Sequence, residues 1–123
     1  MGLSPMDKPE TLSVPSFGIS TDAMTGPEAL AAFRQSVQDV FTLTCLGDEW
    51  QYRLNLSAWH LGTIMVGRFQ CSALAFDRDA ALVATSGLDH LLVQLYVEGG
   101  FAGAAADHLV VVTAGDVVIF DLA

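Results

Sequence analysis

The stretch WQYRLNLSAW, residues 50 to 59, alternates apolar and polar side chains and decides the fold class. Successive side chains of a β-strand point to opposite faces, so alternation places every second residue on the same face. One face of this segment is suited to a core and the other to water, which predicts a half-buried antiparallel strand. The apolar set is Trp50, Tyr52, Leu54, Leu56 and Ala58.

Five further segments are rich in β-branched and aromatic residues and predict additional strands. They cover residues 42–46, 62–75, 91–98, 108–113 and 117–121. Short strands with almost no helix between them must pair antiparallel, and the sheet must curve so that its apolar faces pack against each other. We therefore expect an all-β jelly-roll barrel. The Ala-rich stretch FDRDAALVATSGLD, residues 76 to 89, is compatible with a short strand or with a loop.

One segment ahead of these strands has helical periodicity. Pro27 and Glu28 suit the first turn of a helix, and apolar residues recur at helical spacing as far as Phe41. We therefore expect one N-terminal amphipathic helix at residues 27–41. Residues 1–24 carry three prolines among Ser, Thr, Asp and Lys, which predicts a flexible leader before a single domain at residues 25–123.

Charge and composition exclude several classes of protein. The chain has 14 acidic and 5 basic residues, a net charge of −9 and scattered arginines, so it should not bind DNA by itself. The N-terminus lacks a signal-peptide pattern, and no apolar run reaches the roughly 18 residues of a membrane span. Cys45 and Cys71 lack metal-ligand or redox spacing and are expected as free, buried thiols. We expect a cytoplasmic protein without membrane contact.

The residues that catalysis or metal binding would need do not form a recognisable pattern. His60, His90 and His108 are far apart in the sequence, and none has a neighbouring His or a suitably spaced carboxylate. No GxSxG motif or Cys/His signature of an activated nucleophile occurs. We therefore expect no enzyme activity, no metal and no cofactor.

The order of the segments resembles a known family. The helix and the alternating strand are followed by GRFQCSALAF at 67–76, LDHLLVQLYVEGG at 88–100 and TAGDVVIFD at 113–121. This order is similar to that of the N-terminal cupin-like domain of AraC/XylS-type transcription regulators, over roughly residues 32–123. The most specific parts are the apolar strand that runs into Gly99 and Gly100, and the AGD turn with the strand after it.

The resemblance implies a function in transcription regulation. The domain in this family binds an effector, dimerises or does both, and so changes the orientation of a C-terminal pair of helix-turn-helix units. The chain would then be a fragment whose DNA-binding domain is absent, with DNA as a partner only through that missing domain. A small standalone cupin enzyme or isomerase is the alternative, and a pure dimerisation module with a filled barrel is a third possibility.

The alternation also predicts where an effector would bind. In a barrel, the apolar face of the strand at 50–58 shares the interior with the strand at 91–98, which favours a small apolar or aromatic effector. Arg53 and Arg68 project outward in this register, but a one-residue bulge would reverse them and favour an acidic effector. Core packing is the alternative role for the same apolar side chains. The candidate ligand-binding residues are Trp50, Tyr52, Leu54, Leu56, Val93 and Leu95.

A second copy of the chain is the other expected partner. Hydrophobic residues make up 52% of the sequence, more than a core of this size can hide. Most homo-oligomers close as two-fold dimers. We expect a homodimer in which the helix at 27–41 or an apolar strand edge meets its symmetry mate.

Overall fold

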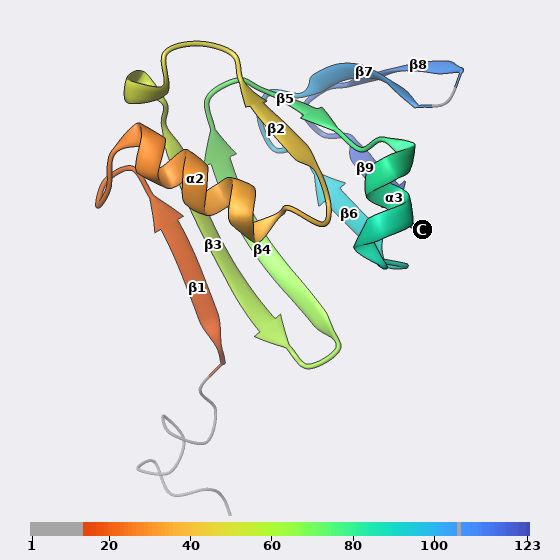
Figure 1. Ribbon diagram of the computed structural model, residues 1–123, viewed down its shortest axis with the longest axis horizontal. Helices are drawn as coiled ribbons and strands as arrows, with labels where there is room; N and C mark the ends of the chain where they lie inside the picture. The colour runs from red at the N-terminus through yellow and green to blue at the C-terminus, as the bar shows by residue number, and fades with distance from the viewer. Residues whose placement is uncertain (1–13, 106) are drawn as a thin grey trace, which may run out of the picture. The chain divides into compact units, whose positions relative to one another are not determined.

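The computed structural model describes residues 14–105 and 107–123 and is mostly β-structure (Figure 1). The predicted all-β class is confirmed. The strands of the described residues form one three-stranded sheet and three two-stranded sheets, and they do not close into a barrel. The chain divides into two compact units, Met1–Asp77 and Arg78–Ala123, and each is described by itself.

A three-stranded antiparallel sheet forms the larger part of the first unit. Its order is β1 (Ser16–Ser20), β3 (Leu54–Leu61) and β4 (Ile64–Cys71), with β3 in the centre. The turn between β3 and β4 contains Gly62, whose φ of 81° is a conformation that favours glycine. Strand β1 lies within the segment for which a leader was predicted, and residues 1–13 of that segment lie outside the described residues.

A second strand pair completes the β-structure of the first unit. Strand β2 (Thr42–Cys45) pairs antiparallel with β5 (Leu74–Asp77). The single strand predicted at 62–75 is therefore two strands, because the chain leaves β4 after Cys71 and enters β5 at Leu74.

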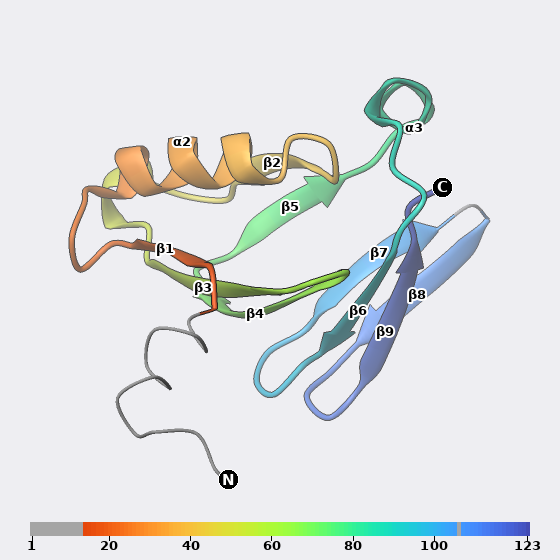
Figure 2. The ribbon, with the colours of Figure 1, turned by 90° about the horizontal axis from the view of Figure 1, so that it is seen from below.

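Helix α2 (Gly26–Ser36) lies across one face of the three-stranded sheet (Figure 2). The side chain of Thr25 accepts a hydrogen bond from the Glu28 amide at 3.2 Å, and the Glu28 carboxylate accepts one from the Thr25 amide at 3.3 Å. This reciprocal pair satisfies amide groups that a helix start would leave without partners. The helix ends at Ser36 rather than at residue 41, because Val37 leaves the helical conformation with φ of −115° and turns follow it.

The core of the first unit lies between α2 and the sheet. Leu30 of the helix and Leu54 of β3 are fully buried, and each such side chain contributes about 1.5–3 kcal/mol to stability. The predicted alternation of β3 is confirmed, since Leu54 and Ala58 are buried whereas Ser57 is exposed. The other buried members of this core are Ile19, Ala29, Phe33, Leu43 and Tyr52.

The alternating strand begins later than the sequence predicts. Residues Glu49–Gln51 form a single 3-10 turn, η1, instead of the start of a strand. The Asp48 carboxylate accepts a hydrogen bond from the Trp50 amide at 2.9 Å. This local cap offers the backbone an alternative to sheet pairing, so Trp50 does not take part in the alternation.

The second unit consists of helix α3 (Ala80–Ser86) and two antiparallel strand pairs. Strand β6 (Leu91–Leu95) pairs with β9 (Val117–Asp121), and β7 (Phe101–Ala105) pairs with β8 (His108–Val112). Strand β9 has the limits predicted from the sequence, and β6 and β8 lie inside their predicted segments. Within the described residues, neither α2 nor α3 has the length and apolar character needed to cross a membrane.

Helix α3 corrects two expectations, namely that the chain has one helix and that the Ala-rich stretch is a strand or loop. The Asp79 carboxylate accepts a hydrogen bond from the Leu82 amide at 2.8 Å and so caps the first turn. Gly87 ends the helix in the left-handed region with φ of 69°. A helix of 7 residues is too short for a periodic pattern, so these two caps are its main signal in the sequence.

Candidate functional site

Four of the six predicted ligand-binding residues lie in the first unit, and α2 covers most of them. Tyr52 and Leu54 belong to the buried core, and Leu56 packs against it. Trp50 stands outside this core on η1, with 71% of its surface exposed. The apolar face of β3 is therefore filled by helix side chains, whereas the sequence had left both core packing and an interior with room for an effector open.

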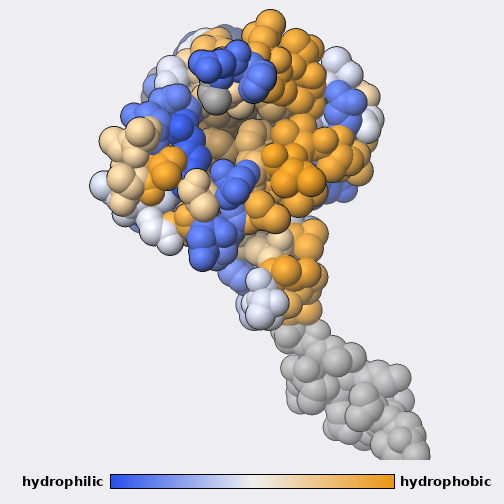
Figure 3. Space-filling view, turned by 90° about the vertical axis from the view of Figure 1, so that its right-hand side faces the viewer, coloured by the Kyte–Doolittle hydropathy of each residue, from blue (hydrophilic) through white to orange (hydrophobic). Residues whose placement is uncertain are grey.

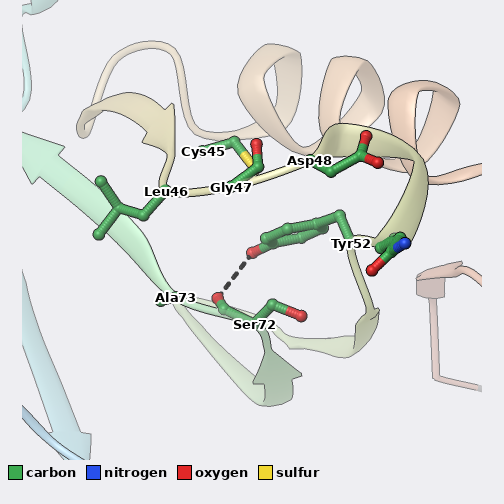
Figure 4. Close-up of a pocket in the computed structure, with 8 residues that line it drawn as sticks. Cys45, Leu46, Gly47, Asp48, Tyr52, Ser72 and Ala73 are labelled. Carbon is green, nitrogen blue, oxygen red and sulfur yellow. Dashed lines mark hydrogen bonds between the residues drawn. The ribbon is translucent and has the colours of Figure 1, made fainter.

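A hollow of about 170 Å³ opens beside Tyr52 (Figure 4). The Tyr52 hydroxyl donates a hydrogen bond to the Ser72 carbonyl at 3.1 Å. Burial raises the pKa of Tyr52 far above its ordinary value of 10.0. This hydroxyl therefore stays protonated at neutral pH and positions the loop at residues 72–73, and it is not a base.

The two cysteines lie near the same hydroxyl. Both are free, but Cys45 is only partly buried and Cys71 is exposed, whereas the sequence predicted two buried thiols. Burial of the thiol group raises the pKa of Cys71, although other atoms of this residue are exposed, and the nearby Tyr52 hydroxyl opposes that shift only in part. Burial therefore disfavours the thiolate, which is the nucleophilic form of a cysteine.

A second hollow, of about 280 Å³, lies on the polar face of the β3–β4 hairpin. Its lining residues alternate with the core-facing residues of the same strands. The antiparallel register places Asn55 opposite Gln70 and Ser57 opposite Arg68, so four polar side chains form a two-by-two group. This group is called the hairpin site below, and it consists of Asn55, Ser57, Arg68 and Gln70.

The signal for the hairpin site was present in the sequence but could not be assembled from it. Alternation predicted that Arg68 points away from the core, and the strand register was needed to bring it opposite Ser57. Register between two strands depends on the turn that joins them, and that turn is set by residues around Gly62.

Strands β6 and β9 present an apolar face in the second unit. The register places Val93 opposite Ile119 and Leu95 opposite Val117, with Leu91 next along β6. These five residues, called the β6–β9 face below, are each between 61% and 66% exposed. Broad apolar areas are also visible in the space-filling view of Figure 3. The predicted ligand-binding residues Val93 and Leu95 therefore belong to an exposed surface of this unit.

Metal-ligating side chains do not gather in the part of the chain that the structure describes. Among residues 14–105 and 107–123, no three His, Cys, Asp or Glu side chains lie close enough to hold a metal ion together. His90 lies 3.9 Å from the Asp89 carboxylate, and both side chains are largely exposed, which is the geometry of an ordinary surface pair.

Relatives of known function do not define a site either. Comparisons with protein-family models, with curated proteins and with solved structures find no match to this chain.

Proposed function

We propose that this chain is a non-catalytic regulatory domain that self-associates and binds an effector, like the cupin-like domain of AraC/XylS-type transcription regulators. The β6–β9 face is the observation that carries this proposal. In the proposal, the strands belong to a jelly-roll fold and the protein acts in the cytoplasm. In this proposal, helix-turn-helix units outside this chain contact the DNA. A chain with 5 basic and 14 acidic residues lacks the positively charged surface that binds a phosphate backbone.

The pairing of β6 with β9 supports the proposal. These two strands come from the segments LDHLLVQLYVEGG and TAGDVVIFD, on which the resemblance chiefly rests, and they are direct neighbours. The AGD turn before β9 is closed by the Thr113 amide, which donates to the Asp116 carboxylate at 2.8 Å, and by Gly115 with φ of 93°. The Tyr96 amide donates to the Asp116 carbonyl at 3.0 Å, which joins this turn to the end of β6.

The size of the β6–β9 face fits a contact with another protein surface. Burying one Val, Leu or Ile side chain is worth about 1.5–3 kcal/mol, which at about 25 cal/mol per Å² corresponds to roughly 60–120 Å². Five such residues at about two-thirds exposure present roughly 200–400 Å², close to the largest apolar patch of a typical monomer. This is about a quarter to a half of the ~800 Å² that each partner buries in a standard interface.

A second copy of the chain is the partner that suits this face best. The five residues of the face are Val, Leu and Ile, with Asp121 opposite Leu91 at one end, so most of the face is complementary in chemistry to itself, as a two-fold interface requires. The other surface that the sequence offered for self-association, the apolar side of α2, is occupied because Ala29, Leu30 and Phe33 are buried in the first unit.

The test is sedimentation velocity of the full chain and of two matched variants. Val93→Asp places a charge in the β6–β9 face. Ile64→Asp places the same charge in the first unit, at an apolar residue that is 60% exposed. We expect the original chain and Ile64→Asp to form dimers at tens of micromolar, and Val93→Asp to be monomeric, because an aspartate in an apolar interface remains without a partner.

Two results would contradict the proposal. A monomeric original chain at tens of micromolar would remove self-association from it. Equal loss of the dimer in both variants would show that the β6–β9 face alone does not control association.

A further inference from the structure

We propose that the hairpin site binds a small ligand through its carboxylate group, with the Arg68 guanidinium as the counter-charge. This inference rests on the proposed function, because it names the chemical class of the effector. It replaces the apolar or aromatic effector that the sequence favoured with a ligand that has an anionic group.

The lining of the hairpin site is suited to an anion. A guanidinium has five N–H donors in a planar fork, and the hydroxyl of Ser57 and the amides of Asn55 and Gln70 add further donors. None of the four lining side chains is acidic, although the chain as a whole has 14 acidic residues. The site is therefore a local concentration of donors on an otherwise acidic chain.

The orientation of Asn55 is fixed by the neighbouring strand. The Ser20 hydroxyl on β1 donates a hydrogen bond to Asn55 Oδ1 at 2.6 Å. Because this bond occupies the oxygen of the amide, the Asn55 NH₂ group remains the end that can donate to a ligand. Ser20 and Asn55 are direct register partners, so the sheet holds this arrangement in place before any ligand binds.

Arg68 is the arginine of the first unit whose charge is available. Arg34 lies 3.9 Å from the Glu49 carboxylate, and Arg53 lies 3.8 Å from the Asp22 carboxylate. Within residues 14–105 and 107–123, Arg68 has neither an ion pair nor a side-chain hydrogen bond. A carboxylate seated between Arg68 and the amides would supply the partner that the other two arginines have within the chain.

Size and charge favour a carboxylate over a phosphate. One guanidinium balances one negative charge, and a net charge of −9 on the chain repels a dianion more strongly than a monoanion. A volume of about 280 Å³ lies just below the range of drug-sized pockets, so the ligand is a small organic acid. Water reaches this open site and weakens its ion pair, so we expect a dissociation constant in the millimolar range.

The test is a titration of the ¹⁵N-labelled full chain with sodium benzoate at constant ionic strength. The signals to follow are the side-chain NH₂ groups of Asn55 and Gln70 and the Nε–H of Arg68. We expect saturable shifts of these signals with benzoate. Benzyl alcohol, which has the same ring without the charge, should give no saturable shift, and sodium phosphate should bind at least about fivefold more weakly than benzoate.

Two variants assign the binding to one guanidinium. Arg68→Gln keeps a polar side chain of similar length but removes the charge, and should weaken benzoate binding at least about fivefold. Arg53→Gln removes an equally charged group that is engaged with Asp22, and should leave the benzoate affinity unchanged.

The outcomes separate this inference from the proposed function. The inference is overturned by an absence of saturation, by phosphate binding as tightly as benzoate, or by equal weakening in the two variants. Sedimentation of the same samples reports self-association independently. A monomer that binds benzoate through Arg68 would keep the carboxylate site and refute the dimer, whereas a dimer that does not bind benzoate would do the reverse.

Discussion

Strands β3 and β6 have the same kind of sequence but different surroundings. Both have apolar residues at every second position, with Leu54, Leu56 and Ala58 on one face of β3 and Leu91, Val93 and Leu95 on one face of β6, whose opposite face also has an apolar residue, Leu92. Helix α2 covers the apolar face of β3, whereas the apolar face of β6 is exposed. Alternation therefore determines which side chains share a face, and the presence of another element determines whether the face becomes a core or a surface.

A matched pair of leucine substitutions tests the difference between the two faces most directly. Leu54→Ala empties a fully buried position and should lower the free energy of unfolding by about 2–5 kcal/mol. Leu95→Ala removes the same atoms from the exposed face and should change it by no more than about 0.5 kcal/mol. The measurement is urea denaturation of both variants at a chain concentration low enough for the monomer, and an equally large loss in Leu95→Ala would mean that the β6–β9 face is packed within one chain.

A pair of glycine substitutions tests how closely α2 is joined to the rest of the first unit. A Cβ at Gly26 would collide with the backbone carbonyl oxygen of Glu49, so Gly26→Ala should destabilise the chain by about 1–3 kcal/mol. A Cβ at Gly47 would meet open space, so Gly47→Ala should have an effect within about 0.5 kcal/mol. Thermal unfolding compares the two, and a neutral Gly26→Ala would show that the helix start can move away.

The ionisation of Tyr52 tests whether water reaches the side chains that α2 covers. Its pKa is raised in the folded chain, so its contribution to stability is complete below pH 10.0 and decreases as the pH rises above that value. Between pH 8 and pH 10.5, the original chain should lose at most about 0.8 kcal/mol more unfolding free energy than Tyr52→Phe, which has no phenol to ionise. Equal losses in urea titrations of the two chains would show that water reaches the hydroxyl freely.

The exposed face should respond to salt, although this is the smallest expected effect. Each copy of the chain has a net charge of −9, so two copies repel each other while their apolar faces attract. Raising NaCl from about 0.05 M to about 0.5 M screens the repulsion and should tighten the dimer a few-fold. Sedimentation at both salt concentrations measures this, and a weaker dimer at high salt would indicate ion pairs in the interface.

Local signals in the sequence predicted much of the fold. Strand β9 has its predicted limits, and Pro27 and Glu28 predicted the start of α2 to within one residue, because turns and helix starts depend on few neighbouring residues. The same kind of signal was missed at Asp79 and Gly87, which cap α3. Capping by Asp48 likewise outweighed the alternation at Trp50.

The candidate sites could be predicted only in part, because they depend on pairs of elements. Alternation gave the outward direction of Arg68, but its place opposite Ser57 follows from the register of the hairpin. The core position of Tyr52 follows from α2 lying over β3, and the pattern of β3 alone does not contain that information. Long-range pairing of elements is therefore the part of the fold that local sequence patterns do not determine.

Because β4 lies at the edge of its sheet, Arg68 also affects whether this edge pairs with a strand of another molecule. In the described residues β4 pairs only with β3, so its outer edge presents backbone N–H and C=O groups that could accept a strand from another molecule. A charged side chain in the middle of such a strand opposes the stacking of identical strands, because like charges would meet at every step. Replacing Arg68 with an apolar residue would therefore remove the charge that protects this edge from pairing with another copy.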